Sequence, residues 1–207
     1  MGETYETPTY TSLQVEDAFE VREYAPMLVA EVTVAGDKKT SRGDAFRILA
    51  AFIFGENVPA ESIEMTAPVT QEPAKIEMTA PVTQEPASAG EAGEERWVVA
   101  FIMPSEYTME TLPKPTDERI RIRMTEPRRY AAVRFSGLHT DGNLEKNRVK
   151  LVDWMAAQDL EPIGEPVYAY YDSPFTLPAL RRNEVLIPLA LPQPEVSEGE
   201  VSTDRTL

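Results

Sequence analysis

Apolar and polar residues alternate along several short segments of the chain, which is the pattern of half-buried β-strands. The run from Phe19 to Val34 divides at Ala25-Pro26 into two such strands. In the second strand, the even-numbered positions from Leu28 to Val34 share one face. Eighteen prolines spread along the chain also favour short strands and turns over a helical bundle. Further strands are predicted for Trp97 to Met103, Arg119 to Met124, Tyr130 to Phe135, Val167 to Tyr171 and Asn183 to Leu189.

Two segments have the residue pattern of α-helices. The first covers about Ser41 to Phe54, with Ser41 as the predicted N-cap and Gly55 just after the helix. The second covers about Asn143 to Gln158, follows Thr140 or Asp141 as cap, and has one apolar stripe.

The first predicted helix is unusual because it is apolar on both faces. Its only polar residue between Ala45 and Phe54 is Arg47. Its outer face is either covered by loops of the chain or offers a platform for an apolar ligand or partner. The residues expected to face a sheet are Ala45, Ile48, Leu49 and Phe52, and those expected on the other side are Arg47, Ala50, Ala51 and Phe54.

Residues 63–74 and 76–87 are the same twelve-residue string, IEMTAPVTQEPA, separated by Lys75. The string alternates apolar and polar residues, as strands do. An antiparallel hairpin with Val69 opposite Ile76 and Ile63 opposite Val82 would put all its apolar side chains on one face. The alternative is a duplication in which one copy is looped out, and we favour the hairpin.

A second, weaker internal symmetry relates the two halves of the chain. The strings VAEVTVAG (29–36) and YAAVRFSG (130–137) both follow a proline break and both precede a predicted helix. The chain is therefore expected to be an α+β domain of two strand–helix–strand–strand units sharing one core, over residues 3–191. The acidic residues 192–207 are expected to be a disordered tail, and residues 86–96 a mobile loop.

Charge and composition exclude several classes of function. The net charge of −15 and the pI near 4.5 disfavour binding of nucleic acid or of anionic membranes. The chain has no cysteine and one histidine, so thiol chemistry and multi-histidine metal sites are excluded. It also lacks a long apolar run and a signal-peptide pattern, and we expect a cytoplasmic protein. No arrangement of nucleophile and base or phosphate-binding glycine loop indicates an enzyme.

Several motifs together resemble the SOUL haem-binding protein family. They are FEVREYAP (19–26), both copies of IEMTAPV, FIMPSEYTMETLPKP (101–115), YDSPFTLPALRRNEV (171–185) and the closing LIPL (186–189). The resemblance implies a distorted antiparallel β-barrel or curved sheet, made of two repeats with two helices outside, similar to bacterial effector-binding domains. It also implies non-catalytic binding of haem or another tetrapyrrole, which folding would not require.

The resemblance also indicates candidate binding residues. Some members have a histidine as axial iron ligand at the position of Glu23, so iron ligation by that route is lost. His139 is the only other nitrogen ligand, and is more simply a polar turn residue. Arg47 is expected to meet a propionate, and Arg181 and Arg182 to tie the last strand to the sheet. The candidate ligand-binding residues, beside the first helix and in the C-terminal motif, are Phe46, Arg47, Ala50, Ala51, Phe54, Tyr171, Phe175 and Leu177.

An alternative function uses the same apolar surface without haem. In that case the protein is an interaction module for a protein partner, or it binds a small apolar effector.

Overall fold

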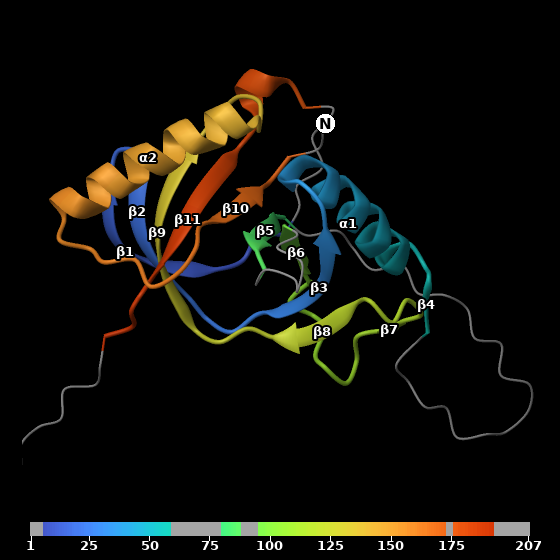
Figure 1. Ribbon diagram of the computed structural model, residues 1–207. Helices are drawn as coiled ribbons and strands as arrows, with labels where there is room; N and C mark the ends of the chain where they lie inside the picture. Colours follow the sequence, from blue (N-terminus) through green and yellow to red (C-terminus); the bar gives the residue numbers. More distant parts are fainter. Residues whose placement is uncertain (1–5, 59–79, 88–94, 173–175, 193–207) are drawn as a thin grey trace, which may run out of the picture.

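A nine-stranded antiparallel sheet, curled into a half-barrel, carries two helices on one of its faces (Figure 1). The computed structural model describes residues 6–58, 80–87, 95–172 and 176–192. The helices are α1 (Lys38–Ile53), α2 (Asp141–Ala157) and the short 3-10 helix η1 (Pro178–Leu180). The strands are β1 (Tyr10–Glu16), β2 (Phe19–Tyr24), β3 (Leu28–Ala35), β4 (Asn57–Val58), β5 (Val82–Pro86), β6 (Arg96–Ile102), β7 (Lys114–Pro115), β8 (Arg121–Met124), β9 (Arg128–Phe135), β10 (Val167–Tyr170) and β11 (Asn183–Leu189).

The order of elements confirms the predicted α+β fold. β3, α1, β5 and β6 form the first strand–helix–strand–strand unit, and β9, α2, β10 and β11 form the second. The strand order in the large sheet is β1-β2-β9-β11-β10-β5-β6-β3-β8, so the units meet where β10 pairs with β5. β4 and β7 form a separate two-stranded sheet.

The two units also exchange strands. β2 precedes the first unit in the chain but pairs with β9 of the second, and β8 precedes the second unit but pairs with β3 of the first. Gly36 and Gly137, each at φ above +100°, end the strands before the two helices. Glycine has no Cβ, and adopts such angles without steric cost. These glycines lie 101 residues apart and give the register that relates the units.

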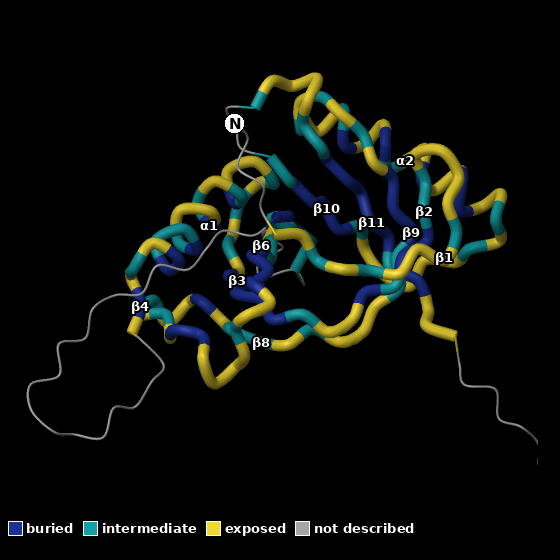
Figure 2. The backbone as a smooth tube through the Cα atoms, turned by 180° about the vertical axis from the view of Figure 1, so that it is seen from behind, coloured by how far each residue is buried: buried dark blue, intermediate teal, exposed yellow. Residues whose placement is uncertain are grey.

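The core lies mainly between the sheet and the helices. α1 buries Ala45, Leu49 and Phe52 against β3 and β6, as the pattern predicted. α2 buries Leu144 and Leu151 against β9, β10 and β11. Figure 2 shows the buried backbone concentrated in the central strands and exposed residues on the outer surfaces of the helices.

The opposite face of the sheet, which we call the helix-free face, has smaller apolar clusters. One contains Tyr24, Ala132 and Leu186, and another contains Val29 and Ile102. Met27 packs against both clusters. Because β2 and β3 lie near opposite ends of the strand order, this shared contact reflects the curl of the sheet.

The predicted start of the first helix is wrong. α1 begins at Lys38, and the Asp37 carboxylate accepts hydrogen bonds from the backbone N–H groups of Lys39 and Thr40. Ser41 is buried inside the helix instead, where its hydroxyl accepts a hydrogen bond from the side-chain amide of Gln84. The predicted end is confirmed, since Phe54 is the C-cap and Gly55 follows with positive φ. The predicted Thr140 cap of α2 is also confirmed.

The predicted hairpin of the repeat lies mostly outside the described residues. Within them, the second copy supplies β5, which pairs with β6 on one edge and β10 on the other. Val82 therefore lies opposite Phe101 and Tyr170, and the predicted pairing of Val82 with Ile63 is wrong.

Other predictions fall largely or wholly outside the described residues: most of the 86–96 loop, and the tail except for Pro192. In the part of the chain that is described, neither helix has the length and apolarity needed to cross a membrane.

Candidate functional site

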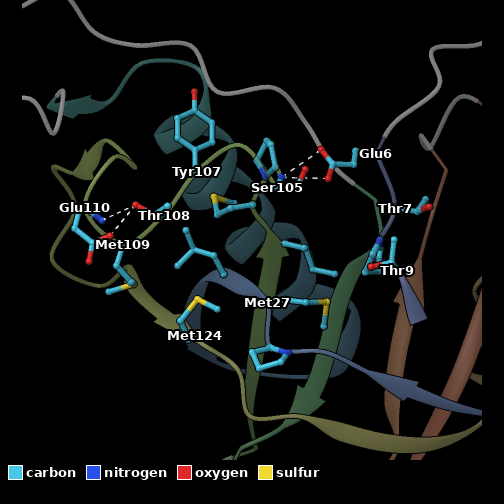
Figure 3. Close-up of a pocket in the computed structure, with 16 residues that line it drawn as sticks. Glu6, Thr7, Thr9, Met27, Ser105, Tyr107, Thr108, Met109, Glu110 and Met124 are labelled. Carbon is cyan, nitrogen blue, oxygen red and sulfur yellow. Dashed lines mark hydrogen bonds between the residues drawn. The ribbon is translucent and has the colours of Figure 1, made fainter. Parts of the chain in front are cut away.

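A cavity of about 560 Å³ opens where β3 begins and β6 and β8 end (Figure 3). This volume lies within the range of small-molecule sites in proteins. The N-terminal residues 6–9 and the loop after β6 complete its walls. Four of the eight methionines of the chain line it: Met27, Met103, Met109 and Met124.

Two smaller cavities, of about 80 and 70 Å³, adjoin the first on the helix-free face. Met27 and Ile102 line all three cavities. The smaller cavities are also lined by Tyr24, Tyr130 and Val167, so their walls are largely aromatic and aliphatic. Together the three form one hollow region, which we call the methionine site.

The strand exchange between the units builds this site. β8 pairs with β3 so that Met124 lies opposite Leu28 at the mouth of the first cavity. Thr125 follows β8 and holds the backbone of Met27 on both sides: its hydroxyl accepts from the Met27 N–H at 2.9 Å, and its own N–H donates to the Met27 carbonyl at 2.8 Å. The backbone that carries the Met27 thioether is therefore fixed.

Carboxylates lie on the rim of the first cavity, and no Lys or Arg lines it among the described residues. The Glu6 carboxylate accepts a hydrogen bond from the Ser105 N–H at 3.1 Å, and that of Glu110 accepts one from the Thr108 hydroxyl at 2.7 Å. The Glu6 carbonyl also accepts from the Ala80 N–H. These bonds tie the N-terminal residues to the loop after β6.

Two arginines lie beside the second cavity. Arg123 pairs with Glu31 at 2.8 Å, whereas Arg128 has no carboxylate within ion-pair distance in the described part of the chain. The Arg128 guanidinium donates instead to the Tyr130 hydroxyl at 3.5 Å. Burial raises the pKa of Glu85, which lines the same cavity, so its charge there is disfavoured. The methionine site thus has one exposed cation that is free to pair with an anionic group.

Beneath the tyrosines of the site lies a buried ion network. The Arg22 guanidinium, 1% exposed, donates to both carboxylate oxygens of Glu184 at 2.6 and 3.2 Å. Arg182 and the Tyr171 hydroxyl donate to the same carboxylate. Arg182 thus joins the turn before β11 to the sheet. Its neighbour Arg181 donates to the Thr176 carbonyl.

The predicted residues on α1 occupy a surface rather than a cavity. Phe46 and Phe54 are exposed, and Ala50 and Ala51 are half-buried. The Arg47 side chain is 78% exposed and pairs with Asp44 on the same helix. None of the three cavities of the methionine site is lined by these residues.

The predicted residues of the C-terminal motif do not join those on α1. The Tyr171 side chain packs on the helix-free face and lines the third cavity, on the other side of the sheet from α1. Leu177 is exposed next to η1, and Phe175 lies outside the described residues.

The two residues considered as iron ligands also lie away from the first cavity. Glu23 pairs with Arg129 at 3.0 Å. The His139 ring packs against Tyr170, whose side chain belongs to the α2 cluster on the helix-bearing face. Burial, with Arg42 and Arg181 nearby, lowers the pKa of His139 to about 4, so its imidazole is neutral at pH 7. In the described residues, no three His, Asp or Glu side chains gather as a metal site would require.

Sequence reasoning missed the methionine site. Its lining residues come from four separate segments that only the strand exchange brings together. The one available signal was the segment FIMPSEYTMETLPKP, which contains Met103 and Met109 and was recognised only as part of the family resemblance.

The fold and the sequence together define the class of this protein. Three solved structures share its fold: the C-terminal domain of EcmrR (TM-score 0.57, 10% identity, 87% of this chain and 98% of that chain), an uncharacterized conserved protein from Listeria innocua (0.60, 14%, 83% and 92%), and a protein from Listeria innocua named as a hydrolase (0.55, 11%, 86% and 94%). At such low identity they establish the fold alone. The chain belongs to the SOUL heme-binding protein family, whose model matches residues 5–188. No curated protein matches it.

Membership of this family allows a test of whether the methionine site fits haem. The apolar walls fit the porphyrin ring, and the thioethers are of a kind that ligates haem iron in other proteins. The exposed Arg128 fits a propionate. The residues present therefore fit the group, although the carboxylates Glu6 and Glu110 do not favour its anionic end near the first cavity.

Proposed function

We propose that this protein binds haem or another tetrapyrrole without catalysing its conversion, and that the ring lies in the methionine site. The observation that carries the proposal is the 560 Å³ cavity, lined by apolar groups, in a chain of the SOUL family. When bound, haem would supply iron and a flat aromatic surface. The chain would supply apolar contacts around the ring, and exclude water from it.

The location differs from the surface beside α1 that the resemblance implies. Burial of a large apolar ligand is the main source of its affinity, and a cavity buries more of the ligand than an exposed helix does. Arg47 is already paired with Asp44 and is well solvated, so it has little to gain from a propionate. Methionine side chains are flexible and polarizable, and adapt to ligands of different shape. A small apolar effector other than a tetrapyrrole is therefore the second candidate for the same site.

A titration with two variants distinguishes the cavity from the helix surface. Met124 is 48% exposed at the cavity mouth, so Met124→Trp fills the cavity without disturbing the core. We expect Met124→Trp to weaken binding of metal-free protoporphyrin by about tenfold, and Arg47→Glu to leave it unchanged. Fluorescence of the porphyrin measures both.

The reverse result would move the site to α1. No binding of either haem or metal-free protoporphyrin, in an assay where a control haem protein responds, would reject the function. In that case a screen of apolar ligands that detects binding lost in Met124→Trp would support the effector alternative.

A further inference from the structure

The iron ligand is the open question of this site, because the residue that some relatives use is absent here. We infer that the thioether of Met27 ligates the iron of a haem bound in the methionine site. This inference rests on the proposed function and adds the residue and the ligand chemistry. It follows from the side chains that surround the site, considered one class at a time.

Histidine is excluded by its position in the fold. The only histidine of the chain, His139, contacts Tyr170 on the helix-bearing face, and it lines none of the three cavities. Met27 packs on the helix-free face. The sheet therefore separates the imidazole from a haem that is bound beside Met27.

The tyrosines that face the site are held as phenols. Burial raises the pKa of Tyr24 to about 12, and burial likewise raises the pKa of Tyr130 and of Tyr171. The hydroxyl of Tyr171 donates to the buried carboxylate of Glu184, which also disfavours its ionisation. Iron ligation by tyrosine requires the phenolate, so these residues are poor candidates. Tyr107, on the wall of the first cavity, turns its hydroxyl away from Met27 and Met124 in Figure 3.

The carboxylates of the site already have other roles. Those of Glu6 and Glu110 accept hydrogen bonds that hold the loop after β6. Glu85 is a poor candidate because its burial favours the neutral acid, and neutral carboxylic acids are weak ligands. Thioethers remain, and they bind haem iron without bringing a charge into an apolar cavity.

Among the four methionines, Met27 has the most suitable surroundings. Met103 is 4% exposed and packs in the α1 cluster, while Met109 and Met124 are each 48% exposed at the rim. Met27 is intermediate in exposure and is the only methionine that lines all three cavities of the methionine site. Its backbone is fixed by Thr125, which limits the entropy lost when the side chain becomes ordered by ligation.

The test compares haem with metal-free protoporphyrin, because only haem offers iron to a ligand. Met27→Leu replaces the thioether by an apolar group of similar size, and Met109→Leu is the matched control on the rim. We expect Met27→Leu to weaken haem binding about tenfold or more and to change the affinity for metal-free protoporphyrin by less than about threefold. Met109→Leu is expected to change neither.

The absorption spectrum and the reduction potential give two further readouts. A thioether ligand produces a sulfur-to-iron charge-transfer band in ferric haem and raises the reduction potential. Both features are expected in the natural protein and in Met109→Leu. In Met27→Leu the band should be lost and the potential should fall.

The outcomes separate the inference from the proposed function. If both porphyrins bind with equal affinity and the haem spectrum has no thioether band, the inference fails and the proposed function stands. If the band persists in Met27→Leu, or disappears in Met109→Leu, the assignment to Met27 is wrong. If neither porphyrin binds the natural protein, the proposed function fails, and the inference fails with it.

Discussion

The two strand–helix–strand–strand units have the same order of elements but different side chains at their outer ends. With the register given by the two glycines, Tyr24 and Tyr130 of the second unit correspond to Thr125 and Val29 of the first. The Tyr24 ring packs 5.2 Å from that of Tyr10 and 5.8 Å from that of Tyr130. In the first unit, a threonine and a valine occupy the same positions, and the 560 Å³ cavity lies beside them.

The comparison shows that this cavity does not follow from the fold itself. Both units have a helix over the sheet and an outer strand from the other unit. Large rings fill the helix-free side of one, and small residues leave the other open. The corresponding arginines differ in the same way: Arg22 is buried with Glu184, whereas Arg123 and its partner Glu31 are partly exposed.

The largest effect is expected where the filled end is anchored. Glu184→Gln removes the charge opposite Arg22 and leaves a buried cation poorly compensated, which costs about 3–5 kcal/mol. Glu31→Gln, at the corresponding arginine of the open end, is expected to cost about 1 kcal/mol because its pair reaches solvent. Urea unfolding followed by circular dichroism measures both. Equal losses in the two variants would contradict the difference between the ends.

A second variant gives the filled end the residue of the open one. Tyr24→Thr removes a ring that is 5% exposed and packed between two others, so we expect a loss of about 3 kcal/mol in unfolding free energy. The new space adjoins the existing cavities, since Tyr24 lines two of them. Binding of metal-free protoporphyrin should therefore be kept or strengthened in titrations at temperatures where the variant is folded. A loss of binding would show that the tyrosine is itself a ligand contact.

The general fold could be predicted from the sequence, because its signals are local. The break at Pro26, the repeated pattern before each helix and the apolar stripe of α2 each lie within a few residues. Errors arose where tertiary contacts decided the outcome. Ser41 is a good N-cap by composition, but β5 buries it and Asp37 caps the helix instead.

The site could not be predicted in the same way. Met27 and Met124 lie 97 residues apart, and only the pairing of β8 with β3 brings them to one cavity. The side of the sheet that Tyr171 faces depends on the register of β10 and β11, which the strand pattern alone does not give. The predicted residues on α1 do lie on its outer side, and whether they bind a ligand is for the titrations to decide.

A third prediction concerns charge at the boundary between the ends. Arg128 occupies the position in the second unit that Met27 occupies in the first, and it lines the cavity between them. Arg128→Glu should weaken binding of protoporphyrin about fivefold, because a propionate would lose its cation and meet a like charge. The dimethyl ester of protoporphyrin, which has no carboxylate, is the control and should bind both proteins equally. A similar loss for the ester would indicate a change in shape rather than charge.

The smallest effect is expected from making the two units more alike in length. β4 and β5 are separated by 23 residues, and deletion of 63–75 leaves 10 while keeping one complete copy of the repeat. The sequence before and within β5 is then unchanged. The shorter connection should stabilise the fold by about 0.7 kcal/mol through a smaller closure entropy. Thermal unfolding measures this, and a large loss of stability would show that both copies are needed.

The exchange of strands makes each unit dependent on the other. β2 lies in the first half of the chain and completes the sheet of the second unit, while β8 lies in the second half and completes the sheet of the first. A chain divided between β6 and β8 would give two fragments that each hold the missing outer strand of the other. Such fragments suit a split-protein assay, in which reassembly on mixing restores the methionine site, because that site needs β3 from one fragment and β8 from the other.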